Sequence, residues 1–235
     1  MNQKLREGDP IDVPISFRIW LDRDMTEQKK TSLRRYTDLP SLLHILKTRK
    51  ISLLDPVSWD DKNDSFFLSQ YKEKMGFKTV LALCFSQSGE TYHHWRVFSN
   101  GSGGVCIEFD RDALTGRLNE EAGVTTGSVR YLTLAEVQGT ALQLQDLPFV
   151  KRYPYKPESE FRALYVSKEQ KRAAIEIPIE LTWIRRVTLS PWLPQALTSS
   201  VRDCIKQASE PHKISVARST LISNDKWKAL GAGTQ

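Results

Sequence analysis

The order of hydrophobic and polar residues along the chain predicts many short strands separated by short helices. Near-continuous apolar runs such as Thr79–Phe85 indicate buried strands, whereas apolar residues three or four positions apart indicate amphipathic helices. Strands are predicted over residues 33–36, 51–54, 79–85, 105–109, 129–132, 160–166, 174–181, 184–189 and 214–217. Helices are predicted over residues 39–49, from 64 or 65 to 75, 90–98, 112–118, 133–147 and 193–207.

Polar residues and glycines mark several of these boundaries. Asp38 and Asp110 offer side-chain oxygens that can cap the helices after them, and Gly76 follows the helix that ends at residue 75. The glycine-rich segment 100–104 precedes a strand and lacks a phosphate-binding lysine, so it is predicted to be a turn rather than a nucleotide-binding loop.

The predicted strands outnumber those that a simple βαβ alternation would give. The sequence therefore predicts the α+β class, with a mixed and strongly bent sheet and flanking helices. Residues 33–235 are expected to form one domain, because their number suits a single large domain. Residues 1–32 are expected to form an N-terminal helical extension, with a short helix over Phe17–Lys30.

Composition indicates a globular protein of the cytoplasm. Hydrophobic residues make up 40% of the chain and charged residues 26%, and no apolar run approaches the ~20 residues that span a bilayer. The polar segment Met1–Pro10 does not resemble a signal peptide. Cys84, Cys106 and Cys204 are isolated and odd in number, which is typical of reduced thiols. A cytoplasmic location without a membrane partner is therefore expected.

Positive charge is concentrated at the C-terminal end of the chain. Residues 151–235 hold 15 Lys and Arg against 8 Asp and Glu, whereas residues 1–150 hold 19 against 20. This distribution suits either a solvated surface or a partner that carries phosphate. One hypothesis is a nucleic-acid-binding module without catalytic activity, which would use Lys168, Lys171, Arg172, Arg185 and Arg186. Another is a metal-free nuclease built around Tyr155–Glu158.

Several chemistries have no support in the sequence. There is no Walker loop and no Gly-x-Ser-x-Gly motif of a serine hydrolase. The histidines lack cysteine or carboxylate neighbours at ligand spacing, so no metal site is expected; they are His44, His93, His94 and His212.

Two polar motifs at strand ends are candidates for ligand binding. Arg35, in the motif Arg35–Thr37, could hold a phosphate or ribose through its planar guanidinium. Ser86 and Ser88 share one side of an extended chain and could bind a ribose or orient a carboxylate. Each motif alone also fits a structural role, as a surface arginine or a polar strand exit.

The third motif is a pair of carboxylates. Glu158 and Glu160 point the same way if their segment is extended. Neighbouring carboxylates raise each other's pKa and can divide the roles of base and electrostatic stabiliser. Such a group beside an anomeric carbon can stabilise an oxocarbenium-like transition state. A charged strand start, with Glu160 paired to Arg162 or Lys156, is the structural alternative.

Taken together, these stretches resemble a bacterial family known as domain of unknown function 2971. The matching segments are Arg35–Thr37, Leu42–Leu46, Asp55–Trp59, Asn63-Asp64, Cys84–Ser86, Trp95, Gly104–Asp110, Tyr155-Lys156 and Glu158–Arg162. The family favours a proline and then a carboxylate after the Asn-Asp pair, where this chain has Ser65, Phe66 and Phe67.

More distantly, the order Arg, then Ser-x-Ser, then Glu-x-Glu resembles the arginine–serine–glutamate pattern of ADP-ribosyltransferases. The chain has Gln87 where that pattern usually has threonine. The resemblance implies a split sheet and a glycosyltransferase-class enzyme, or an NAD glycohydrolase, that cleaves the nicotinamide–ribose bond of NAD. It further implies a protein or nucleic-acid acceptor, no metal, and a role as a bacterial toxin or phage-defence component.

The same resemblance implies roles for individual residues. Glu160 would be the catalytic carboxylate, and Glu158 would orient the acceptor. The NAD-binding residues would be Arg35, Tyr36, Thr37, Ser86, Ser88 and Tyr71. Among these, Arg35 would hold the phosphates or ribose, the serines would support the nicotinamide ribose, and either tyrosine would stack on the nicotinamide; Tyr71 could equally be core.

Overall fold

A computed structural model describes residues 31–99, 101–139 and 142–233. Almost all of the predicted N-terminal extension, including the helix expected over Phe17–Lys30, lies outside these described residues. None of the helices within them has the length and apolar character needed to cross a bilayer.

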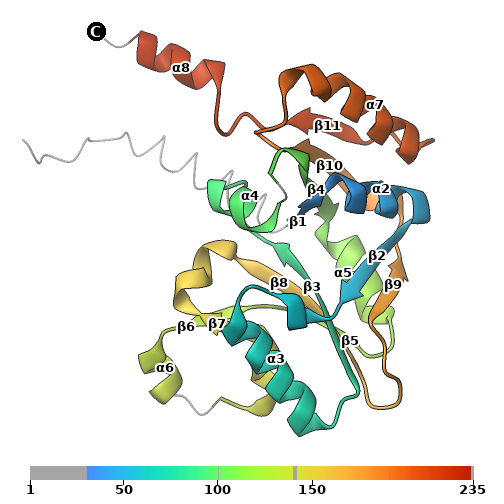
Figure 1. Ribbon diagram of the computed structural model, residues 1–235, viewed down its shortest axis with the longest axis vertical. Helices are drawn as coiled ribbons and strands as arrows, with labels where there is room; N and C mark the ends of the chain where they lie inside the picture. The colour runs from blue at the N-terminus through green and yellow to red at the C-terminus, as the bar shows by residue number, and fades with distance from the viewer. Residues whose placement is uncertain (1–30, 100, 140–141, 234–235) are drawn as a thin grey trace, which may run out of the picture.

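Most strands of the described chain join one mixed sheet of 9 strands (Figure 1). These are β1 (Ser32–Asp38), β2 (Lys50–Leu54), β3 (Thr79–Ser86), β4 (Gly104–Asp110), β5 (Val124–Ser128), β8 (Glu160–Ser167), β9 (Ala174–Pro178), β10 (Ile184–Leu189) and β11 (Ser215–Arg218). Their pairing is antiparallel except between β10 and β11. A second, parallel sheet consists of β6 (Arg130–Leu132) and β7 (Val150–Arg152).

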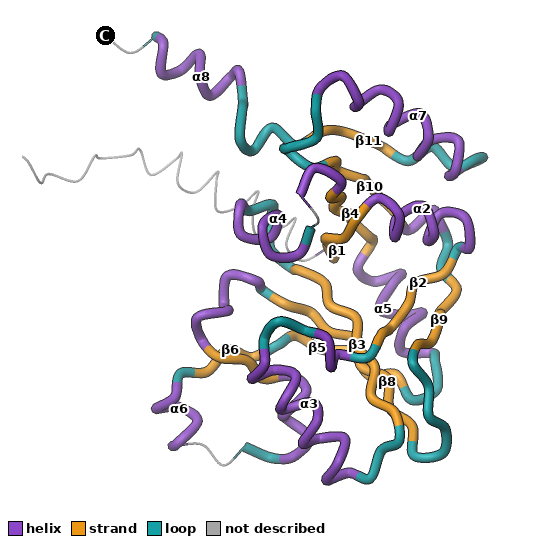
Figure 2. The backbone as a smooth tube through the Cα atoms, in the orientation of Figure 1, coloured by secondary structure: helices purple, strands orange, loops and turns teal. Residues whose placement is uncertain are grey.

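The helices flank the sheet, except α8, which projects away from it at the upper left of Figure 2. They are α2 (Leu39–Thr48), α3 (Lys62–Met75), α4 (Tyr92–Phe98), α5 (Arg111–Glu120), α6 (Leu134–Gly139), α7 (Thr198–Ser209) and α8 (Asp225–Ala232). Aspartate, a preferred N-cap residue, caps three of them. The side chains of Asp38, Asp61 and Asp110 accept hydrogen bonds from backbone N–H groups at the starts of α2, α3 and α5. Gly76 ends α3 in the left-handed conformation, as expected.

Several predicted boundaries are wrong for local reasons. The helix predicted over 133–147 is α6 followed by a 3₁₀ turn, Leu144–Phe149, that contains Pro148 and begins at a capping box between Gln143 and Asp146. The helix predicted from 193 begins only at Thr198, because Pro194 starts a separate 3₁₀ turn. The strand predicted over 174–181 stops at Pro178, which has no N–H for the ladder.

Strand β3 joins two halves of the main sheet, so the sheet is split and bent (Figures 1 and 2). It meets β1 at the single register pair Arg34–Ser86 and β2 at the single pair Leu54–Ala82. By contrast, β1 pairs with β4, and β3 with β8, along their lengths. The predicted α+β class with a mixed, bent sheet and flanking helices is therefore confirmed.

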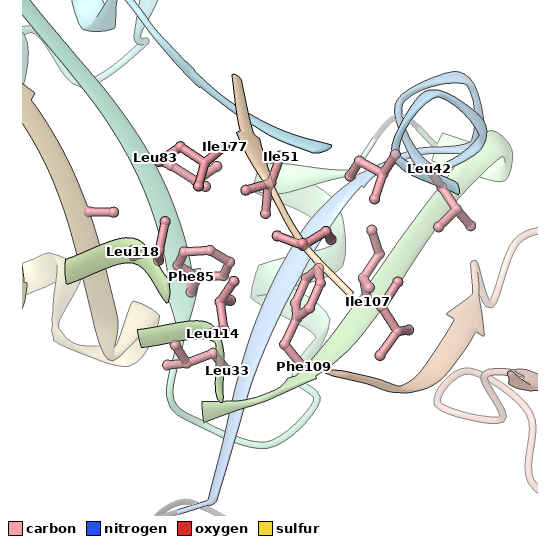
Figure 3. Close-up of a cluster of buried hydrophobic side chains, with 14 of the residues drawn as sticks. Leu33, Leu42, Ile51, Leu83, Phe85, Ile107, Phe109, Leu114, Leu118 and Ile177 are labelled. Carbon is pink, nitrogen blue, oxygen red and sulfur yellow. The ribbon is translucent and has the colours of Figure 1, made fainter. Parts of the chain in front are cut away.

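One face of the sheet carries the main hydrophobic core. Leu33, Phe85 and Phe109 project from β1, β3 and β4 onto this face, where Phe85 and Phe109 pack edge to face at 6.1 Å (Figure 3). Helices α2 and α5 contribute Leu42 and Leu114 to the same cluster. Because side chains alternate along a strand, the residues between these apolar positions face the other way.

The opposite face is divided between two helices. Helix α4 covers the β1–β4 side, where Trp95 is fully buried in a cluster with Tyr36 and Cys106. Helix α3 covers the β3–β8 side, where Leu68 packs with Ala82 in a second cluster. Neither helix covers the polar residues of β1, β3 and β8 that lie between these clusters, and these residues line a cleft.

Candidate functional site

A cleft of about 500 Å³ opens on this polar face. Its volume falls in the range of small-molecule sites. The side chains around it come from β1, β3, the start of α3, the end of α4, and the segment around β7 and β8. Those that matter below are Arg34, Arg35, Tyr36, Trp59, Asp61, Asp64, Cys84, Ser86, Phe98, Lys151, Tyr155, Glu158 and Glu160.

Three polar residues form one row across the floor of the cleft. Arg34 pairs with Ser86 between β1 and β3, and Ser86 pairs with Glu160 between β3 and β8. Paired residues of antiparallel strands project from the same face, so the register itself brings arginine, serine and glutamate together. All three are buried.

Two neighbouring arginines reach the cleft from β1. Arg34, in the row, forms an ion pair with Glu108 at 3.2 Å and donates to the Ser88 carbonyl at 3.0 Å. Arg35 belongs to the opposite face by alternation, but its guanidinium enters the gap where β1 and β3 separate and donates to the Cys84 carbonyl at 3.4 Å. Burial lowers the pKa of Arg35 from its usual value. Both side chains place positive charge at one end of the cleft.

At the other end, the cleft holds a buried acidic cluster. Lys151 Nζ lies 2.7 Å from Glu158 Oε2, 3.3 Å from Glu160 Oε2 and 3.6 Å from Asp64 Oδ2. The prediction that the two glutamates lie on one extended segment is wrong. Glu158 ends the 3₁₀ turn Tyr153–Glu158, and the backbone of Ser159 is left-handed with φ 46°. This reversal, rather than strand alternation, brings both carboxylates to the same lysine.

Arg162 supports the cluster from below. Its guanidinium binds Asp64 through two nitrogens, at 3.0 and 2.6 Å, and Glu160 Oε1 through Nε at 2.7 Å. It also donates to the Pro148 carbonyl at 2.7 Å and lies 5.0 Å from the centre of the Trp59 ring. Arg162 is fully buried, so it is a structural partner of the acids and not a ligand-facing group.

The two glutamates differ in their affinity for a proton. Burial favours the neutral form of Glu160, but the charges of Arg162 and Lys151 outweigh it and lower the pKa of Glu160 to about 2. Burial raises the pKa of Glu158, against the opposing effect of Lys151. Among the described residues, Glu158 Oε1 has no hydrogen-bond partner, whereas both oxygens of Glu160 are held. Glu160 is thus a fixed carboxylate, whereas Glu158 keeps one oxygen that no described residue binds.

Ser86 lies within hydrogen-bond distance of a histidine, yet the network is structural. The Ser86 hydroxyl donates to the Glu158 carbonyl at 2.9 Å, and the His94 ring nitrogen Nε2 lies 3.0 Å from Ser86 Oγ. Thr91 Oγ1 accepts the His94 backbone N–H and lies 2.5 Å from Nδ1, so its own proton points at Nδ1. We therefore assign the ring proton to Nε2. In this tautomer His94 cannot accept a proton from Ser86, and burial lowers the pKa of His94.

The other predicted site residues are distributed differently. Tyr36 lines the cleft with its ring stacked on His94 at 5.1 Å. Thr37 lines a neighbouring hollow that shares Val97 and Phe98 with the cleft. Ser88 lies behind Ser86, with their hydroxyl oxygens 2.9 Å apart. Tyr71 does not line the cleft; it packs against Phe77 at 5.4 Å in the second hydrophobic cluster.

Three residues of the cleft escaped the sequence predictions. Arg34 stands next to the predicted Arg35, and only the strand register distinguishes them. Lys151 comes from β7, which is three residues long and has no hydrophobic pattern. Asp64 was predicted as a possible start of α3 and as part of the Asn63-Asp64 segment of the family resemblance, but not as a residue of the site.

The basic residues of the alternative nucleic-acid hypothesis occupy two places. Lys168, Lys171 and Arg172 lie in the β8–β9 connection at the lower end of Figure 1, whereas Arg185 and Arg186 lie on β10 in its upper part. The Arg185 guanidinium forms an ion pair with Asp110 at 2.5 Å. A continuous basic surface made of these five residues is therefore not formed.

Comparisons with known proteins find similar solved structures but no matching family model. No protein-family model and no curated protein sequence matches the chain, so the resemblance to domain of unknown function 2971 gains no support. Among solved structures, Thermus sp. 2.9 DarT in complex with NAD⁺ is similar with a TM-score of 0.42 at 12% identity, over 80% of this chain and 95% of that one. The same protein in complex with ADP-ribosylated single-stranded DNA gives a TM-score of 0.41 at 13% identity, over 80% and 94%.

Proposed function

We propose that this protein is an NAD-dependent enzyme of the ADP-ribosyltransferase type, or an NAD glycohydrolase, that cleaves the nicotinamide–ribose bond. The observation that carries the proposal is the register row of Arg34, Ser86 and Glu160 on the floor of a single cleft. The charges of the cleft support it. Arg34 and Arg35 lie at one end, where a pyrophosphate would bind, and carboxylates lie at the other, where a ribose would bind.

The reaction needs a fixed negative charge beside the anomeric carbon. When the bond between that carbon and the nicotinamide nitrogen breaks, its electron pair stays with the nicotinamide and positive charge develops on the ribose. The ionised Glu160 would stabilise this charge, because it is held in place and needs no reorganisation. The predicted catalytic role of Glu160 stays a proposal that agrees with its geometry.

The second step is attack by an acceptor on the opposite face of the ribose. The acceptor forms a bond to the anomeric carbon and gives up a proton, which Glu158 would take through Oε1, the oxygen that none of the described residues binds. With water as the acceptor, the products are ADP-ribose, nicotinamide and a proton. Glu158 would therefore act as the base, which refines the predicted role of orienting the acceptor.

An acceptor would pass helix α4 on its way into the cleft. Phe98, which lines both the cleft and the neighbouring hollow, is exposed there, and Arg96 lies 4.3 Å from the centre of the Trp192 ring and 5.2 Å from that of Tyr92. Flat aromatic and guanidinium groups suit a stacking partner such as a base of single-stranded nucleic acid. A protein acceptor is the other class to be tested. Consumption of NAD would harm the cell that holds the enzyme, which supports the expected toxin or phage-defence role.

Release of free nicotinamide from NAD tests the proposal. The wild type is incubated with NAD alone, with single-stranded DNA or RNA, and with protein acceptors, and nicotinamide is measured by liquid chromatography. Glu160→Gln is expected to lower the rate by about 10²–10³-fold, the usual effect of losing one transition-state contact. Glu120→Gln, the same change at an exposed position of α5, is the matched control and should leave the rate unchanged.

Two results would overturn the assignment. One is a wild type that releases no nicotinamide above the enzyme-free rate with any acceptor. The other is a folded Glu160→Gln variant, checked by circular dichroism, that remains as active as the wild type.

A further inference from the structure

The small sheet of β6 and β7 has no place in the main core, yet it makes contact with the acidic cluster twice. Tyr131 and Lys151 are register partners in this sheet. The Tyr131 hydroxyl accepts a hydrogen bond from the backbone N–H of Glu160 at 2.7 Å, and Lys151 Nζ binds the side chain of the same residue at 3.3 Å. The β6–β7 sheet thus contacts both the backbone and the carboxylate of Glu160.

Lys151 is also the point at which the two glutamates meet. Its ammonium is 2.7 Å from Glu158 and 3.3 Å from Glu160, and it lines the cleft while remaining only 8% exposed. Two carboxylates this close would repel one another in a buried site, and one of them would take up a proton. The lysine charge, in contact with both carboxylates, opposes that repulsion.

Every charged or titratable group that faces this pair belongs to a packed element of known position. The carboxylates of Asp61 and Asp64 approach from α3, at 3.9 and 3.6 Å from Lys151 Nζ. The other groups are Arg162 on β8, Cys84 on β3, Tyr131 on β6, Tyr155, whose ring centre lies 4.9 Å from Lys151 Nζ, and His94 on α4, whose Nε2 lies 3.1 Å from the Glu158 carbonyl oxygen. Of these, Lys151 and Arg162 are the cations, and Arg162 reaches Glu160 but forms no bond with Glu158 within the described chain.

We propose that Lys151 is a positioning residue of the cleft: presented by the β6–β7 sheet, its ammonium holds Glu158 and Glu160 together so that one ribose meets both. This inference rests on the proposed NAD-cleaving function. Lys151 acts through the two glutamates and takes no part in bond breaking itself. Its positive charge sets the pH above which both carboxylates are ionised, so that Glu160 carries its negative charge and Glu158 can accept a proton.

The pH dependence of nicotinamide release distinguishes this role from simple support of the fold. Lys151→Met removes the charge, so both carboxylates ionise at higher pH, and the acid limb of the kcat profile should move up by about one to three pH units. The kcat should fall at least about tenfold, while KM for NAD changes little, because the arginines at the other end of the cleft are untouched. Lys151→Arg keeps the charge and should restore the acid limb.

Two further variants complete the design. Lys74→Met, the same change at an exposed position of α3, is the matched control and should leave kcat and its pH profile unchanged. Glu158→Gln leaves Lys151 to Glu160 alone, so its residual activity should show an acid limb at lower pH. This second measurement decides the matter even if Lys151→Met does not fold.

The inference fails if folded Lys151→Met keeps the wild-type acid limb, if Lys151→Arg moves the limb as far as Lys151→Met does, or if Glu158→Gln moves it upward or not at all. These outcomes require an active wild type. A wild type that releases no nicotinamide refutes the proposed function itself, so the two failures are distinguishable.

Discussion

Replacement of Arg162 by methionine tests how the buried acidic cluster is stabilised. The change removes the two bonds to Asp64, the bond to Glu160 and the bond to the Pro148 carbonyl, at 3.0, 2.6, 2.7 and 2.7 Å, while a side chain of similar length still fills most of the space. Removing one partner of a buried ion pair costs about 3–5 kcal/mol of the free energy of unfolding, because the remaining charges stay buried. That range is the effect expected at neutral pH.

The depressed pKa of Glu160 gives a second estimate. In the folded protein this pKa is about 2, against an ordinary value of 4.5. A folded-state pKa below the unfolded value stabilises the protein above the unfolded pKa, and this stabilisation is lost as the pH falls from about 4.5 to about 2. The difference is worth roughly 3 kcal/mol for a side chain that is almost fully buried, which agrees with the first estimate.

The variant should also respond differently to pH. Burial already raises the pKa of Asp64 in the wild type, against the opposing charge of Arg162. Without Arg162 this pKa rises further above the unfolded value, so protonation of Asp64 favours the folded variant as the pH falls. The stability difference between wild type and Arg162→Met should therefore be largest near pH 7.5 and shrink by about 1 kcal/mol or more at pH 5.5.

Urea unfolding followed by circular dichroism at both pH values measures this difference. Lys74→Met serves as the control for the loss of a positive charge at an exposed site. The double variant Arg162→Met/Glu160→Gln should recover part of the loss, because it removes one of the two buried carboxylates that Arg162 binds. A stability loss below about 1 kcal/mol, or one that is the same at both pH values, would refute the view that Arg162 acts through charge.

Two other predictions concern groups buried near the cleft. Burial raises the pKa of the Cys84 thiol well above its usual value and that of Cys106 to about 12. In the native protein, iodoacetamide should therefore label the exposed Cys204 and spare the other two cysteines. Rapid labelling of Cys84, measured by peptide mass spectrometry, would contradict this. The Tyr36 hydroxyl is buried without a hydrogen-bond partner among the described residues. Tyr36→Phe should therefore leave the free energy of unfolding, measured with urea, unchanged or raise it by up to about 1 kcal/mol. A loss of more than that would show that the hydroxyl makes a bond after all.

The fold could be predicted wherever the pattern of side chains is locally strong. The apolar run of β3 and the aspartate before α2 fix those elements without reference to the rest of the chain. The predicted helix over 133–147 failed because a capping box and Pro148 outweigh its apolar stripe. Strand β5 was missed because its sequence, Val-Thr-Thr-Gly-Ser, gains its place from pairing with β8 rather than from its own pattern.

The candidate site was predictable only as residue types. Ser86, Glu158 and Glu160 were recognised from their spacing, and the structure brings them to one cleft with Arg35. The choice between Arg34 and Arg35 depends on which face of β1 pairs with Ser86, and this register is set by long-range packing. Lys151 depends on a strand of three residues whose position is fixed by its neighbours, so no local signal identifies it.

The cleft has a floor of paired strands and walls made from helix ends. Trp59, before α3, and Phe98, at the end of α4, lie in these walls and belong to no strand, although the Trp59 ring also contacts Arg162. In the proposed enzyme, bond cleavage would therefore depend on the paired strands, whereas the choice of acceptor would depend on the helix ends. Substitutions at the entrance would then change the acceptor while the strand register stays the same.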